Sequence, residues 1–209
     1  MFDIIEKGGI LMYPILALSV ISLAIFMERM YTLRKEKFAP ASFTKMAKSL
    51  LLRGAYVEAE SLCKENDSAI SRIVYEIIQN RTQPWLQLID AVESAGKREA
   101  DRLGRFQEAM STIIVLSPLL GLLGTILGMI TLFNVVSGGG MGDPQALSSG
   151  IAVALLTTAA GLSVAIPAQV FYYVIKTRSD GIISALERES SEVAGVISAG
   201  HGDEVQKNR

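Results

Sequence analysis

The sequence predicts an all-α membrane protein with three transmembrane helices and long helical extensions on the cytoplasmic side. Of its 209 residues, 50% are hydrophobic and the mean hydropathy is +0.36, which is high for a soluble domain. No charge interrupts residues 8–27, and Asp143 is the only charged residue between Ala109 and Ile175. The segment between these two stretches alternates apolar and charged residues at a helical period.

Residues 8–27 predict the first transmembrane helix, which follows a short N-terminal segment, residues 1–7. About 20 residues rising about 1.5 Å each cross a hydrocarbon core of about 30 Å. A cleaved signal peptide is the rival interpretation. However, the start MFDIIEK is acidic where a signal peptide is basic, and no small-residue cleavage site precedes Glu28 and Arg29. We therefore interpret this stretch as a retained span.

A glycine-rich segment divides the second apolar stretch. SGGGMGDP, residues 137–144, ends in Asp-Pro and has the composition of a turn. We therefore expect a second span at residues 111–136, an external loop at 137–148 and a third span at 149–175.

The polar segment at residues 28–110 predicts a helical cytoplasmic domain. LLRGAYVEAESLCKEND and SAISRIVYEIIQNR each have a helical period, and Asn66-Asp67-Ser68 predicts a cap between them. Pro84 suits the first turn of another helix. Because no strong helix breaker lies between Trp85 and Pro118, we expect one helix over residues 85–136, about 78 Å long. Residues 176–209 predict a further helix that ends in a disordered tail, GHGDEVQKNR.

The distribution of lysine and arginine predicts the orientation in the membrane. The loop at residues 137–148 carries neither residue. By the positive-inside rule, residues 28–110 and the C-terminus lie in the cytoplasm, and the N-terminus and the loop lie outside. The basic residues beside the three spans are Arg29, Arg34, Lys35, Lys37, Lys97, Arg98, Arg102, Arg105, Lys176 and Arg178.

Charge and composition argue against several classes of function. The net charge is −1 and no basic block occurs, so we expect no nucleic-acid partner. Cys63 is interpreted as a free cytosolic thiol and His201 as a solvated side chain. An activated serine nucleophile requires a neighbouring His, Lys or Asp, and Ser163 within the third span has none beside it. The sequence therefore predicts no enzyme, no metal site and no cofactor.

Small residues form a stripe on each of the two later spans. Gly121, Thr125 and Gly128 share a face, and Gly124 with Gly128 forms a G-x-x-x-G pattern. A similar stripe on the third span consists of Ala154, Thr158, Gly161 and Ala165.

Two interpretations of these stripes remain open. Small residues commonly allow close helix packing in lipid, and a membrane threonine commonly bonds its own i−4 carbonyl. Alternatively, the stripes face a polar group of another chain, because a hydroxyl can donate to a carboxylate and accept from a carboxylic acid. Neither span contains Asp, Glu, Lys, Arg or His, so any proton carrier must belong to a partner.

The stretches SPLLGLLGTILGMITLF and GIAVALLTTAAGLSVAIPAQVFYY resemble the MotA/TolQ/ExbB family of ion-driven motor subunits. The three-span layout is similar to that of the ExbB and TolQ branch. The resemblance implies a pentameric ring in the bacterial inner membrane, with the N-terminus periplasmic and the C-terminus cytoplasmic. It also implies a pore that holds two ExbD- or TolR-like single-span partners, whose membrane aspartate carries the proton. The work would reach a TonB- or TolA-like protein, in TonB-dependent transport or the Tol-Pal system.

The resemblance also assigns roles to residues of this sequence. Thr125 and Thr158 match the pore-facing threonines and are therefore expected in the ion pathway. Pro118 and Pro167 match the prolines that shape the helices, and the glycines and alanines of the two stripes are expected to line the pore and pack the helices. Val153 departs from the family pattern, since GIAVAL stands where family members have G-I-A-E-A-L. The role of that glutamate is not carried over.

Other functions are weighed against the motor subunit. A passive membrane scaffold would use the stripes only to hold helices together. A small-solute carrier is disfavoured by three spans with no inverted repeat and no charge at the midplane. Sodium in place of protons remains an alternative, because oxygen ligands suit hard cations.

Overall fold

The computed structural model describes residues 9–137 and 144–207, and the regular elements there are all α-helices. The predicted N-terminal segment and residues 138–143 of the predicted loop at residues 137–148 lie outside the described residues. Residues 144–148 of that predicted loop are helical, so the loop prediction is wrong for them. The chain divides into two compact units. We call Met1–Met30 with Phe106–Ile175 the apolar unit, and Tyr31–Arg105 with Lys176–Arg209 the charged unit.

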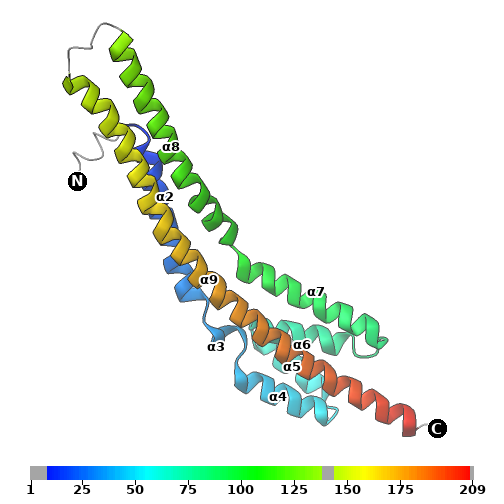
Figure 1. Ribbon diagram of the computed structural model, residues 1–209. Coiled ribbons are helices and arrows are strands. Elements are labelled where there is room, and N and C mark those ends of the chain that lie inside the picture. Colours follow the sequence, from blue (N-terminus) through cyan, green and yellow to red (C-terminus); the bar gives the residue numbers. More distant parts are fainter. Residues whose placement is uncertain (1–8, 138–143, 208–209) are drawn as a thin grey trace. The chain divides into compact units, whose positions relative to one another are not determined.

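The apolar unit contains three helices that are long and apolar enough to cross a membrane. They are α2 (Met12–Thr32), α8 (Gln107–Ser137) and the first part of α9 (Pro144–Lys207), shown in Figure 1. The Phe26 ring of α2 stacks on the Phe171 ring of α9, with centroids 4.2 Å apart. These three helices, together with the helical elements elsewhere in the described residues, confirm the predicted all-α fold with three candidate membrane spans. In lipid a helix is favoured because it satisfies each backbone polar group within one segment.

The predicted continuous helix over residues 85–136 is wrong, because the backbone leaves the helical region at Arg105. Helix α7 (Trp85–Gly104) ends there and α8 begins at Gln107. Phe106 between them has a φ of +71°, in the left-handed region that a bulky residue seldom adopts. The guanidinium carbon of Arg29 lies 4.8 Å from the centroid of the Phe106 ring. Composition gave no sign of this break, since neither Arg105 nor Phe106 is a helix breaker.

The charged unit is built around α6 (Ala69–Gln79), whose apolar residues are fully buried. The cap predicted at Ser68 is confirmed: Ser68 Oγ accepts from the Ser71 N–H at 3.2 Å, and Ser71 Oγ accepts from the Ser68 N–H at 3.2 Å. An ion pair between Lys48 and Glu192 joins α4 to α9. The other helices of this unit are α3 (Lys35–Phe38), α4 (Ala41–Leu52), α5 (Tyr56–Glu65), α7 and the last part of α9.

Helix α9 continues past the predicted end of the third span at residue 175 and reaches Lys207. The prediction of a disordered tail is therefore wrong for the backbone up to that residue. The side chains beyond Ile197, that of His201 included, lie outside the described residues.

Candidate functional site on helices α8 and α9

Helices α8 and α9 approach each other closely where both carry glycine. A Cβ atom placed on Gly121 would lie 3.0 Å from the main-chain oxygen of Thr157 and 3.0 Å from the Cα of Thr158. A Cβ placed on Gly161 would lie 2.5 Å from the main-chain oxygen of Ser117. Real Cβ atoms do not come as close as 2.5 Å to a backbone oxygen, so the contact requires glycine at position 161. At position 121 a Cβ would be tight against the backbone of α9, which would have to shift by a few tenths of an ångström.

The same contact continues along both helices. A Cβ on Gly124 would meet the side chain of Thr157, whose own Cβ lies only 2.5 Å away. A Cβ on Gly128 would lie 2.9 Å from the main-chain oxygen of Gly150 and 3.0 Å from the Cβ of Ala154. The three glycines of α8 therefore contact α9 of their own chain.

Two hydroxyls in this contact have different partners. Thr157 is 1% exposed, and its Oγ1 donates to the carbonyl oxygens of Val153 and Ala154, each at 3.0 Å within its own helix. Thr158 is half-buried, and its Oγ1 donates across the helix pair to the carbonyl oxygen of Gly121 at 3.1 Å. Thr158 therefore bonds a neighbouring helix and not its own i−4 carbonyl.

Thr125 lies on α8, half-buried, and its Oγ1 donates to the carbonyl oxygen of Leu122 at 2.6 Å. Among the described residues, no hydrogen bond joins Thr125 to Thr158. The predicted small residues Ala154 and Ala165 of α9 are 5% and 7% exposed. The structure thus brings Thr158 to the glycine contact and leaves Thr125 beside it along α8.

The two predicted prolines lie inside the helices. Pro118 is half-buried within α8 and Pro167 is exposed within α9. Each removes one backbone donor from its helix, which allows a local bend. For all ten residues that the sequence assigns to this site, a place in a pore stays a prediction.

Sequence reasoning gave no role to Thr157 and Ser117, which the structure places at the centre of the contact. The side chain of Thr157 lies against Gly124, and Ser117 is fully buried with its Oγ donating to the carbonyl oxygen of Ile113 at 2.8 Å. The two adjacent threonines, 157 and 158, were the feature of the sequence that could have indicated this contact. Spacing alone did not show which of the two hydroxyls bonds α8.

The chemistry of this site is hydrogen bonding without charge. In the described parts of residues 109–137 and 150–175 there is no ionisable side chain other than the phenols of Tyr172 and Tyr173. Val153 occupies a half-buried position on α9. Since the Thr125 and Thr158 hydroxyls donate their protons to main-chain oxygens, each oxygen keeps lone pairs that can accept a further bond.

The fold and the site define a class of protein: an all-helical membrane protein in which two uncharged helices pack through glycine. The model of the MotA/TolQ/ExbB proton channel family matches residues 65–188, which is more than half of the chain, and the chain belongs to this family.

Several known relatives place the chain in the ExbB/TolQ branch. It is 31% identical over 178 residues to an ExbB-like biopolymer transport protein of Synechocystis sp., covering 84% of this chain and 70% of the relative. An ExbB homolog of Methanothermobacter thermautotrophicus is 28% identical over 186 residues, covering 88% of this chain and 66% of that relative. The Tol-Pal system protein TolQ of Pseudomonas aeruginosa is 27% identical over 213 residues, covering 94% and 92%.

Proposed function

We propose that this chain is the ring-forming subunit of an ion-driven motor in the bacterial inner membrane. Five copies enclose the single spans of two ExbD- or TolR-like partners, and a membrane aspartate of the partner carries the proton. The ring couples proton flow to work on a TonB- or TolA-like protein across the periplasm. Membership of the family carries this proposal, together with the uncharged hydroxyl-bearing pair α8 and α9.

The hydrogen bonds at the site support a specific role for the threonines. Thr158 and Thr125 donate their protons to main-chain oxygens and remain acceptors. An acceptor suits a protonated aspartate, which donates its own O–H. A deprotonated aspartate would need the hydroxyl to turn and give up its bond to the main chain. The surface formed by α8 and α9 would thus favour passage of the neutral acid. Transfer of the neutral acid into a membrane costs less free energy than transfer of the charged carboxylate.

The absence of charge on these spans agrees with the same role. A fixed cation on α8 or α9 would hold the partner's aspartate in one ion pair, because such a pair is strong where water is excluded. Val153 stands where the family pattern has a glutamate, so the proposed path in this chain depends on the partner's acid and the threonines. Protons are proposed ahead of sodium on the family resemblance.

The orientation belongs to the proposal as well. Apart from Lys7, the basic residues that flank the spans lie on one side, which favours a periplasmic N-terminus and a cytoplasmic C-terminus. The charged unit would then lie in the cytoplasm.

A passive membrane scaffold is the second candidate function. One observation favours it: Gly121, Gly124 and Gly128 all contact α9 of the same chain, so close packing alone accounts for them. A scaffold needs no partner with an acidic span.

Native mass spectrometry of the protein, extracted gently from its own membranes, tests the proposal. We expect a ring of five copies that holds two small single-span chains with an aspartate in the span. Rings that lack such chains, from membranes in which one is expressed, would favour the scaffold.

A further inference from the structure

A cavity of about 350 Å³ lies between α5, α6 and α7 in the charged unit. Ligand pockets in proteins begin at about 300 Å³, so the cavity is large enough for a small molecule. Its wall includes four cations and two carboxylates, contributed by all three helices. These are Lys64, Arg72, Arg98, Arg102, Glu76 and Glu99.

The lining carries an excess of positive charge. Four cations and two carboxylates leave the residues that line the cavity with a formal charge of +2. Two more carboxylates, Glu60 and Asp67, pair with Lys64 and Arg72 but lie outside the lining. The Asp67 side chain is 99% exposed, so solvent and salt screen its charge. An anion in the cavity would therefore contact more cations than carboxylates.

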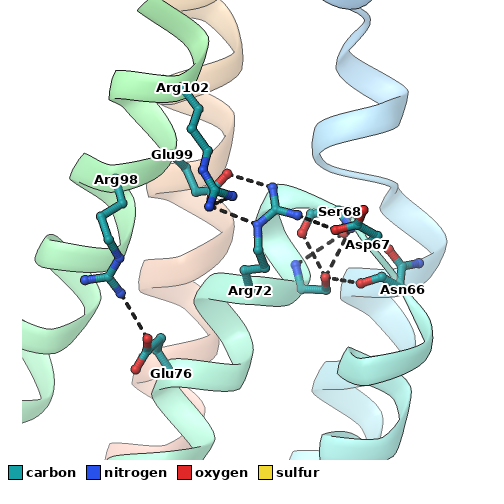
Figure 2. Close-up of polar contacts among 9 residues, drawn as sticks. Asn66, Asp67, Ser68, Arg72, Glu76, Arg98, Glu99 and Arg102 are labelled. Carbon is teal, nitrogen blue, oxygen red and sulfur yellow. Dashed lines mark hydrogen bonds and ion pairs between the residues drawn. The ribbon is translucent and has the colours of Figure 1, made fainter.

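Buried Glu99 holds two of the arginines in place, as Figure 2 shows. Glu99 is 4% exposed and accepts from Arg72 Nε at 2.9 Å, from Arg72 Nη2 at 2.8 Å and from Arg102 Nη1 at 3.0 Å. Its hydrogen bond to Arg72 raises the pKa of that guanidinium above its ordinary value. Because the side chains of Arg72 and Arg102 are already ordered, binding a ligand would cost less side-chain entropy.

Arg98 and Arg102 retain donors for a ligand. A guanidinium has five N–H groups. Among the described residues, Arg98 donates only to Glu76, at 2.9 Å, and Arg102 only to Glu99. The two residues are four apart on α7 and their side chains are 58% and 64% exposed. Planar guanidinium groups match the geometry of phosphate oxygens.

The rest of the wall adds no negative charge. Burial raises the pKa of the Cys63 thiol to about 11, so the thiol is neutral near pH 7. Ile73, Ala95 and the ring of Tyr75 supply apolar surface beside the cations. Such a wall fits a ligand with both a charged group and a small organic part.

We propose that this cavity binds a small anion bearing phosphate groups. Arg98 and Arg102 contact the phosphate oxygens, and Lys64 adds a third cation. Glu99 positions Arg102 and Glu76 positions Arg98, and neither carboxylate contacts the ligand. The proposal stands apart from the ion-driven motor, since it uses only residues of the charged unit.

Calorimetric titration of the full-length protein with inorganic phosphate and with pyrophosphate tests this site. The protein is held in phosphatidylcholine nanodiscs, and sodium chloride keeps the ionic strength constant. We expect saturable binding that is tighter for pyrophosphate, and at least about tenfold weaker in the double variant Arg98→Gln/Arg102→Gln. Arg188→Gln is the matched control, because Arg188 is an equally exposed arginine of the same unit outside the cavity.

Unchanged affinity in the double variant, or no saturable binding at millimolar pyrophosphate, would overturn the proposal. Lys64→Gln provides an independent variant, and a weaker affinity there supports the site. Repeating the titration in phosphatidylglycerol nanodiscs identifies the source of the phosphate group. If the original protein binds pyrophosphate more weakly in these nanodiscs and the double variant shows no such loss, lipid headgroups occupy the cavity. If pyrophosphate binding is unchanged, a soluble anion occupies it.

Discussion

The hydroxyl of Thr158 on α9 donates a hydrogen bond to the carbonyl oxygen of Gly121 on α8, over 3.1 Å. In the part of the chain that the structure describes, the hydroxyl of Thr157, the residue before it, bonds only carbonyl oxygens of its own helix. Interhelical hydrogen bonds in membranes are worth about 0.6 kcal/mol on average, so this bond alone does not hold the pair together. Its consequence is geometric, because it fixes the Thr158 oxygen as an acceptor at a set depth beside Gly121.

The glycine contact should be sensitive to a single methyl group. We expect Gly124→Ala to lower the free energy of unfolding by about 1–3 kcal/mol, because the new Cβ would overlap the Thr157 side chain. Gly96→Ala is the matched control. Nothing lies within 4 Å of a Cβ at Gly96 in α7, so alanine should stabilise that helix by up to about 1 kcal/mol. Thermal unfolding of both variants in detergent measures the difference, and equal effects would contradict the contact described here.

Removal of the buried carboxylate should destabilise the charged unit. Glu99→Gln leaves Arg72 and Arg102 without their shared partner. Since these arginine side chains are 37% and 64% exposed, solvent replaces part of the interaction, and we expect a loss of about 1–3 kcal/mol. Urea unfolding measures it. Glu93→Gln, at an exposed position of the same helix, should change stability by less than about 0.5 kcal/mol.

The single cysteine should react slowly and in a pH-dependent way. Burial raises the pKa of Cys63 from 9.0 to about 11, so at pH 8 the reactive thiolate is about 100-fold scarcer than in the unfolded chain. The raised pKa contributes stability that is complete below about pH 9 and is lost as the pH rises through about 11. Alkylation with iodoacetamide, followed by mass spectrometry from pH 7 to pH 10, measures this. A rate at pH 8 equal to that in urea would show that the thiol is not buried.

The proposed orientation can be tested with single cysteines in a Cys63→Ser background. We expect a membrane-impermeant maleimide to label Ser148→Cys in intact spheroplasts, because the proposed orientation puts the start of α9 outside. Ser191→Cys, an exposed position late in α9, should be labelled only after permeabilisation. The reverse pattern would invert the proposed topology.

Much of this fold could be predicted because its signals are local. Uncharged stretches identify candidate spans, and Ser68 shows that a helix cap can be read from neighbouring residues. The break between α7 and α8 could not be predicted in this way. It depends on the left-handed backbone of Phe106, whose ring lies beneath the Arg29 guanidinium from a distant part of the chain.

The candidate sites show the same division. Spacing identified the glycines and Thr158, yet it did not distinguish a threonine that bonds its own helix from one that bonds the next. The cavity of the charged unit was missed altogether. Arg72 and Glu99 are 27 residues apart, and only the packing of α6 against α7 brings them together.

Exchange of the Thr158 hydroxyl distinguishes a role in ion-coupled work from a role in helix packing. Thr158→Val has nearly the same shape but cannot accept a hydrogen bond, whereas Thr158→Ser keeps the hydroxyl. The measurement is proton-dependent work of the complex in cells, by transport or envelope integrity, with ring assembly checked by native mass spectrometry. We predict assembled rings in both variants, with work lost in Thr158→Val and largely retained in Thr158→Ser. Normal work in Thr158→Val would contradict the account and leave Thr158 with a packing role only.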